Sequence, residues 1–203
     1  MPTTIDYYFA PQSPWTYLGH ERFTQLARVA GATIRVLPID LGKVFPISGG
    51  LPLGQRAPQR QAYRLVELQR ISNHLNAPLN LKPKYFPVAG DNASLLIIAV
   101  ELNDGSEAAM KIAGAVFSAV WTQERDIADA AVLTELLAKC GLNSNRLAQS
   151  QAPDVQAHYE ANTQQAIDAG VFGAPSYVVK GEIFWGQDRL NFVEGKLKSL
   201  QSF

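Results

Sequence analysis

The sequence predicts an α/β protein in which a block of helices interrupts a small β-sheet. Two observations lead to this fold class. Strand patterns occur near both ends of the 203-residue chain, whereas the apolar residues of its middle recur at helical spacing. The N-terminal part also alternates strand, helix and strand, which is typical of a βαβ unit.

The N-terminal segment is expected to form this βαβ unit. Apolar residues alternate in Thr4–Ala10, which indicates a strand. Ser13 followed by Pro14 is typical of a helix start, because serine caps the free N–H groups and proline suits the first helical position. The helix is expected to end near Val29. Thr33–Ile39 then forms a second strand, parallel to the first.

The middle of the chain is expected to consist of helices, with one loop before the first helix and a second loop after it. Lys43–Arg56 is rich in glycine and proline, and Asn76–Asp91 contains three prolines, so both segments are predicted to be loops. The helices are expected at Pro58–Leu75, Asn92–Asn103, Ser106–Gln123, Ala130–Lys139 and Pro153–Ala169.

The C-terminal part returns to β-structure. Ser176–Val179 and Glu182–Trp185 are predicted strands, and Lys180-Gly181 between them suits a tight hairpin turn. A last helix is expected from Asp188 to about Leu200. This element order is that of a thioredoxin-like fold, with a discontinuous domain of residues 1–45 and 155–203 and an inserted all-helical domain of residues 46–154.

Composition excludes several function classes. The chain has 18 lysines and arginines against 18 aspartates and glutamates, so it lacks the positive charge expected of a protein that binds nucleic acid or an anionic membrane. No apolar run is long enough to cross a bilayer, and no signal peptide is apparent. A cytoplasmic protein is therefore expected.

Cysteine and histidine are sparse. Cys140 is the single cysteine, so no intrachain disulfide can form, and its side chain is expected to be a small buried apolar group. The three histidines, His20, His74 and His158, are not spaced as ligands. We expect them at the surface and predict no metal site.

Ser13-Pro14-Trp15-Thr16 lies where a thioredoxin-like fold carries its redox C-x-x-C motif. Disulfide exchange requires a thiolate, and both cysteine positions hold hydroxyl residues here. One interpretation is that Ser13 is only a helix cap. The other is that the helix N-terminus and the Ser13 hydroxyl hold the thiolate of a ligand.

In the second interpretation, the available interaction energies are large enough to keep a ligand thiol ionised. Lowering the pKa of a free thiol by about two units requires about 2.7 kcal/mol. A helix terminus supplies up to about 1 kcal/mol, and a charge-assisted hydrogen bond about 1.5–3 kcal/mol. A serine hydrolase is excluded, because the surrounding sequence is not G-x-S-x-G and Pro14 removes the N–H group that an oxyanion hole would use.

Two C-terminal features have both structural and functional interpretations. Ala174-Pro175 is either an ordinary turn or the cis-proline that faces the helix start in thioredoxin-like proteins. Asp188 suits a helix cap, and its carboxylate also suits a ligand ammonium. The aromatic residues Phe45, Tyr85 and Phe86 are expected either in an apolar pocket or in the core.

Several motifs together resemble the 2-hydroxychromene-2-carboxylate isomerases and the kappa-class glutathione transferases. They are, in order along the chain, Y-Y-F-A-P-Q-S-P-W-T-Y-L, I-D-L-G-K-V, G-G-L-P, P-Q-R-Q-A-Y-R-L-V-E-L-Q-R, A-V-W-T-Q-E-R-D-I-A-D, F-G-A-P-S and W-G-Q-D-R-L. The resemblance extends over essentially the whole chain and implies a DsbA-like fold with glutathione as cofactor or cosubstrate.

The resemblance also implies roles for individual residues. Ser13 resembles the serine that holds the glutathione sulfur. Ala174 resembles the residue before the cis-proline, whose backbone pairs with the cysteinyl part of glutathione. Arg60 falls where the family has a lysine for the glycyl carboxylate, and arginine keeps the charge. Gly50 falls where an asparagine is usual, so one polar contact is expected to be missing.

The segment after the hairpin completes the expected glutathione site. Gln187 and Asp188 resemble the pair that holds the γ-glutamyl end, and Trp185 and Gly186 precede them in the same motif. For the second substrate, Lys43 is the candidate cation for a carboxylate and Tyr85 a candidate wall of an aromatic pocket.

The first functional hypothesis is a glutathione-dependent isomerase of aromatic catabolism, which acts on a small aromatic carboxylate. In that family glutathione adds to a conjugated enone, which permits rotation, and then leaves. This interconverts 2-hydroxychromene-2-carboxylate and trans-o-hydroxybenzylidenepyruvate. The alternatives are a kappa-like transferase that conjugates electrophiles and a redox-inactive thioredoxin-like module that binds an extended peptide. Family members are often dimers, so a homodimer is expected.

Overall fold

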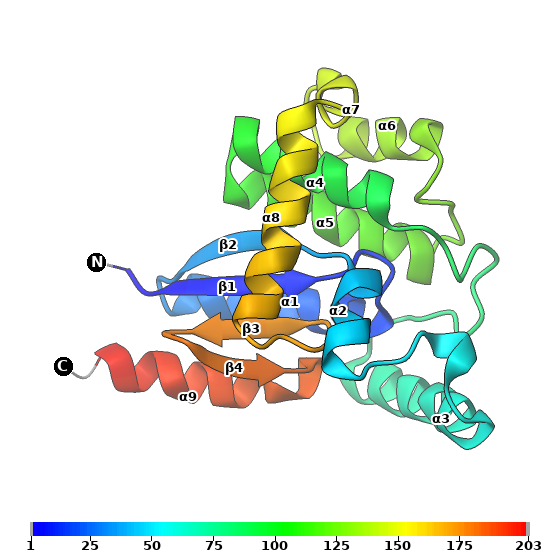
Figure 1. The fold of residues 1–203 in the computed structure, drawn as a ribbon, viewed down its shortest axis with the longest axis vertical. Coiled ribbons are helices and arrows are strands. Elements are labelled where there is room, and N and C mark those ends of the chain that lie inside the picture. Colours follow the sequence, from blue (N-terminus) through cyan, green and yellow to red (C-terminus); the bar gives the residue numbers. More distant parts are fainter. Residues whose placement is uncertain (1, 202–203) are drawn as a thin grey trace.

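A computed structural model describes residues 2–201 of the chain. Figure 1 shows a small sheet with helices on both faces and further helices beyond one edge. The strand order is β2-β1-β3-β4, where β1 and β2 pair in parallel and β1–β3 and β3–β4 pair antiparallel. The strands are β1 (Thr4–Phe9), β2 (Thr33–Pro38), β3 (Ser176–Val179) and β4 (Glu182–Trp185). The parallel first pair and the C-terminal hairpin are thus confirmed.

Helix α1 (Pro14–Val29) connects β1 to β2 and begins where the sequence predicted. Ser13 is its N-cap, and the Ser13 Oγ accepts a hydrogen bond from the Thr16 N–H at 3.3 Å. Pro14 occupies the first turn, where its missing N–H costs no hydrogen bond. Serine and proline therefore fix the start of α1 directly after β1.

The alternation along β1 assigns its side chains to two cores. Ile5, Tyr7 and Phe9 pack with residues of α1, α4, α5 and α9, whereas Tyr8 packs on the opposite face. That second core contains Val44 of α2 and residues of α8, which crosses the sheet in Figure 1. The sheet is therefore buried on both faces, and its side chains alternate between α1 and α8.

The remaining helices form the interrupting block and the last element. They are α2 (Leu41–Ser48), α3 (Pro58–Leu75), α4 (Asp91–Asp104), α5 (Ser106–Trp121), α6 (Ala130–Lys139), α7 (Asn145–Gln149), α8 (Pro153–Asp168) and α9 (Leu190–Gln201), with short 3-10 helices η1 (Leu53–Gln55) and η2 (Gln187–Arg189). The expected helices are present, most of them with ends shifted by one or two residues.

The prediction of a loop over Lys43–Arg56 was wrong in part, because α2 and η1 lie there. Asp40 caps α2 by accepting a hydrogen bond from the Gly42 N–H at 2.7 Å, and Val44 is buried in the second core. Tertiary packing of one apolar residue and a local cap therefore outweigh the glycine and proline content.

The prediction that His20 lies at the surface was also wrong, since only 7% of it is exposed. It lies on the core face of α1, between Tyr7 and Phe117. Cys140 is buried, as expected. Within residues 2–201, no helix is both long and apolar enough to span a membrane, and no three metal-ligating side chains cluster.

Candidate functional site

Ser13 and Ala174, which are far apart in the sequence, meet at the start of α1. The Ser13 Oγ donates a long hydrogen bond of 3.5 Å to the Ala174 carbonyl oxygen, while it accepts the Thr16 N–H. The Ala174-Pro175 peptide bond is cis, which decides between the two interpretations that the sequence left open. The hydroxyl thus lies between the partial positive charge of the α1 N-terminus and the backbone that leads into β3.

The hairpin end is attached to the same backbone. The Gly186 N–H donates to the Pro175 carbonyl oxygen at 2.9 Å, which fixes the end of β4 beside the cis-proline. Gly186 has a φ of 107°, and a Cβ there would lie 2.6 Å from the Asp188 Oδ1. Only glycine accepts this conformation readily, so the chain can turn here from β4 into η2.

Gln187 is held against α1. It is buried, its side-chain oxygen accepts a hydrogen bond from the Arg22 guanidinium at 2.9 Å, and its backbone carbonyl accepts a second one at 3.3 Å. Asp188, by contrast, is exposed and pairs at 2.6 Å with its neighbour Arg189. An exposed pair of this kind is weak, so the Asp188 carboxylate can exchange Arg189 for the ammonium of a ligand.

Trp185 forms an aromatic surface next to Ala174. Its indole approaches Gly173 so closely that a Cβ there would lie 2.5 Å from the indole nitrogen. Its ring packs against Phe172 at 4.8 Å between centroids, and about half of Trp185 is exposed. This surface borders the Ala174–Pro175 segment.

Three other residues singled out in the sequence make no hydrogen bond with Ser13, Ala174 or the 185–188 segment. Lys43 is exposed on α2, and Arg60 is exposed in the first turn of α3. Tyr85 is exposed in the loop after α3, with the Lys84 ammonium 5.0 Å from its ring centroid.

The aromatic loop residues divide between two environments. Phe86 packs against the main core, with its ring centroid 4.9 Å from that of Trp121. Phe45 fills the space beside Gly50, where a Cβ would lie 2.3 Å from its ring. Gly50 thus permits a phenylalanine ring to occupy the position that a polar side chain would need.

Arginines near the start of α3 form a positive cluster that the sequence analysis did not identify. Arg56 and Arg64 are partly buried, and burial together with neighbouring charge lowers both pKa values. Burial is the larger cause for Arg64, followed by repulsion from Arg56, and its pKa falls to about 10. The spacing of four residues between Arg56, Arg60 and Arg64 was the available signal.

Two further site residues are Thr16, to which the sequence analysis assigned no role of its own, and Arg22, which it did not identify. Thr16 occupies the second hydroxyl position of the Ser13–Thr16 motif. It is fully buried, and its Oγ1 has no hydrogen-bond partner among residues 2–201. An unpaired buried hydroxyl beside Ser13 is able to accept or donate one more hydrogen bond. Arg22 gave no signal, because an arginine on a helix is ordinarily solvated.

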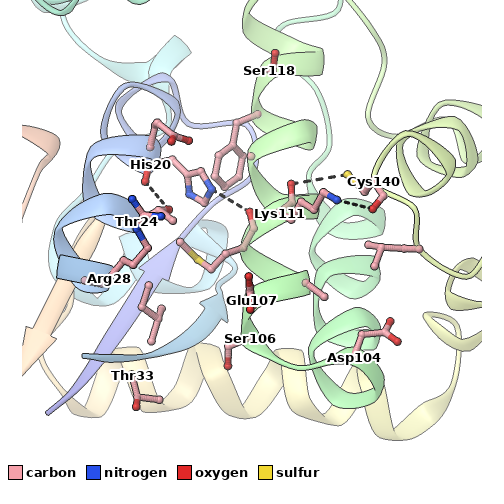
Figure 2. A pocket seen from close by; sticks show the side chains of 18 of the residues that line it. His20, Thr24, Arg28, Thr33, Asp104, Ser106, Glu107, Lys111, Ser118 and Cys140 are labelled. Carbon is pink, nitrogen blue, oxygen red and sulfur yellow. Dashed lines mark hydrogen bonds between the residues drawn. The ribbon is translucent and has the colours of Figure 1, made fainter. Parts of the chain in front are cut away.

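A cleft of about 1160 Å³ lies elsewhere, between α1 and α5. Figure 2 shows His20 and Thr24 on one side and Lys111 with Cys140 on the other. Lys111 donates a 2.8 Å hydrogen bond to the Cys140 carbonyl oxygen. Neither Ser13 nor Ala174 lines this cleft, so its size alone does not mark it as the reaction site.

Comparisons with known proteins agree with this architecture. Residues 4–198 match the family model described as DSBA-like thioredoxin domain. A 2-hydroxychromene-2-carboxylate isomerase of Sphingobium xenophagum is 30% identical, over 97% of this chain and 99% of the relative. Glutathione S-transferase kappa 1 of Caenorhabditis elegans is 25% identical, over 97% of this chain and 92% of the relative.

A solved structure gives the same result in three dimensions. The selenomethionine structure of a 2-hydroxychromene-2-carboxylate isomerase superposes with a TM-score of 0.78 and 28% identity, over 97% of this chain and 95% of that chain. The fold is therefore a DsbA-like thioredoxin fold with a helical insertion. The chain belongs to the DsbA-like thioredoxin family, in the group of the 2-hydroxychromene-2-carboxylate isomerases and kappa-class glutathione transferases.

Proposed function

We propose that this protein is a glutathione-dependent cis–trans isomerase of the 2-hydroxychromene-2-carboxylate isomerase type. One observation carries the proposal. The Ser13 hydroxyl lies between the N-terminus of α1 and the Ala174 carbonyl oxygen, at the position of a redox cysteine. The single cysteine, Cys140, is buried and faces the Lys111 carbonyl oxygen at 3.9 Å. A thiol at Ser13 must therefore come from a ligand.

The residues around Ser13 suit the parts of glutathione. The Ala174 backbone would pair with the cysteinyl part, and Trp185 and Gly186 would border it. Asp188 would bind the γ-glutamyl ammonium, and Gln187, held by Arg22, would position that segment. Arg60 would bind the glycyl carboxylate. The names of the kappa-class relatives support glutathione as the ligand.

When bound, glutathione would supply a thiol nucleophile that reversibly saturates a conjugated double bond and so permits rotation about it. The protein's contribution is to keep that sulfur ionised. Ser13 would donate a hydrogen bond to it, and the α1 terminus would add its partial positive charge. Because the Ser13 hydroxyl carries a single proton, this hydrogen bond would replace the long one that it donates to the Ala174 carbonyl oxygen.

The second substrate would be a small aromatic carboxylate, namely 2-hydroxychromene-2-carboxylate or its ring-opened isomer. Its rings suit an apolar pocket that includes Tyr85, and its carboxylate would need a cation, for which Lys43 is the candidate named from the sequence. The names of the isomerase relatives, at about 30% identity over nearly their full length, support this substrate class. Residues 46–154 as an inserted domain, the homodimer and the cytoplasmic location stay predictions.

The test combines binding with turnover. Calorimetric titration of reduced glutathione into the wild-type protein should show saturable binding, and Ser13→Ala should weaken it about tenfold or more, since a charge-assisted hydrogen bond is worth about 1.5–3 kcal/mol. Ser118→Ala, which changes a hydroxyl on α5, is the matched control. Isomerisation of trans-o-hydroxybenzylidenepyruvate should require glutathione. Absence of glutathione binding to the wild type would overturn the proposal.

The two alternatives give different results in the same assays. A kappa-like transferase would bind glutathione and conjugate electrophiles, yet leave o-hydroxybenzylidenepyruvate unisomerised. A redox-inactive peptide-binding module would bind no glutathione. The kappa-class relative at 25% identity favours the transferase as the second candidate.

A further inference from the structure

Arg64 is a partly buried cation without a counterion. Its guanidinium lies over two aromatic rings, with the carbon Cζ 5.2 Å from the Phe86 centroid and 5.8 Å from the Trp121 centroid. Among residues 2–201 it forms no salt bridge and no hydrogen bond. By contrast, Arg70, on the same helix, pairs with Glu67 at 2.7 Å. The aromatic rings orient the Arg64 guanidinium and leave its N–H donors unused.

The neighbours of Arg64 increase the positive charge rather than neutralise it. Arg56 is close enough to lower the pKa of Arg64, and Arg60 lowers the pKa of Arg56 in turn. The Arg56 Nε donates to the Leu51 carbonyl oxygen at 2.9 Å, which holds this side chain in place. An anion bound beside these side chains would offset their mutual repulsion.

The loop that carries Phe86 connects this cluster to the start of α1. It follows α3, and at its beginning the Tyr17 hydroxyl donates to the Pro78 carbonyl oxygen at 2.6 Å. At its end, Gly90 lies against Gln12, whose Oε1 would be 2.2 Å from a Cβ at that position. Gln12 immediately precedes Ser13. The loop after α3 therefore contacts the arginine cluster through Phe86 and contacts the residue before Ser13 through Gly90.

We propose that Arg64, assisted by Arg56, binds the carboxylate of the second substrate, with the aromatic part of that substrate near Phe86. This inference rests on the proposed function and reassigns the substrate cation from Lys43 to Arg64. Lys43 is an exposed side chain on α2, whereas Arg64 lies over two aromatic rings and presents a planar pair of donors that matches a carboxylate. Arg60 remains available for the glycyl carboxylate of glutathione.

The experiment measures whether the protein prefers a carboxylate to its neutral amide. The probe is 2-oxo-4-phenylbutanoate, which lacks the conjugated alkene and so cannot undergo conjugate addition of a thiol, and it is compared with the corresponding amide. Each is titrated by calorimetry, with and without saturating glutathione. The wild type should bind the acid about tenfold or more tightly than the amide, as expected for a charge-assisted pair.

Arg64→Met keeps an apolar stem over the aromatic rings and removes the charge, so it should reduce the preference for the acid to about twofold or less. Lys43→Met should keep the preference, and so should Arg70→Gln, the matched control on α3. Arg56→Gln is a second variant that leaves the Arg64 contacts with Phe86 and Trp121 in place, and it should reduce the preference several-fold. Unchanged glutathione binding would show that each variant is folded.

Two results would overturn this assignment: a wild type that does not distinguish the acid from the amide, or an Arg64→Met variant that distinguishes them as the wild type does. Failure of the proposed function is observed separately, as the absence of glutathione binding. The acid and the amide can still be compared in that case, because both are also titrated without glutathione. Loss of the preference in Lys43→Met but not in Arg64→Met would return the role to Lys43.

Discussion

Acidification should destabilise this protein through His20. The imidazole is almost fully buried, and burial lowers its pKa from 6.5 to about 4, although the Met110 carbonyl raises it slightly. The Nε2 lies 3.0 Å from that carbonyl oxygen, and the Nδ1 lies 3.4 Å from the Tyr7 hydroxyl. A neutral ring donates from Nε2 to Met110 and accepts at Nδ1 from Tyr7, whereas a charged ring would donate from both nitrogens and leave the buried Tyr7 O–H group without that acceptor.

The sign and the magnitude follow from proton linkage. The unfolded chain protonates His20 near its ordinary pKa of 6.5, and the folded chain only near 4. The contribution to stability is therefore fully present above about pH 6.5 and is lost progressively as the pH falls toward 4. A difference of about 2.5 pKa units corresponds to about 3 kcal/mol in total, of which about 2 kcal/mol is lost between about pH 7 and pH 5.

Urea unfolding of wild type and His20→Gln tests this value. Glutamine keeps a donor for Met110 and an acceptor for Tyr7 but does not titrate. The stability difference between the two proteins should change by about 2 kcal/mol between about pH 7 and pH 5. Buried carboxyl groups such as Glu101, whose pKa burial raises, are common to both proteins and cancel. His74→Gln, at an exposed histidine, is the control, and a pH-independent difference for His20→Gln would refute the reasoning.

Two further predictions concern the segment after β4. Gly186→Ala should destabilise the protein by about 1–3 kcal/mol and weaken glutathione binding, because it forces a side chain into a φ of 107° beside Asp188. Gly195→Ala, in open space on α9, should instead stabilise by about 1 kcal/mol in the same urea titrations. Asp188→Asn should lower the affinity for glutathione about tenfold in calorimetry and leave the free energy of unfolding unchanged within about 0.5 kcal/mol. If Asp188→Asn bound glutathione as tightly as the Asp168→Asn control, Asp188 would have no role in binding.

Local sequence signals determined much of the fold. Ser13-Pro14 indicated the start of α1 because a cap and a first-turn proline act on adjacent backbone groups. Gly181 indicated the hairpin turn, in which both Lys180 and Gly181 have positive φ, a conformation that glycine adopts without strain. The alternation in β1 indicated a strand, and element order gave the thioredoxin-like topology. The juxtaposition of Ser13 and Ala174 was inferable only by analogy with thioredoxin-like proteins, in which a cis-proline faces the helix start.

The tertiary structure alone decided the features that depend on distant neighbours. Helix α2 forms in a segment rich in glycine and proline because Val44 finds a core on the far face of the sheet. His20 is buried because Tyr7 and Met110 offer it partners. Arg64 is distinguished from an ordinary solvated arginine only by the rings of Phe86 and Trp121. Sequence sets local backbone preferences, whereas burial and charge depend on which residues packing brings together.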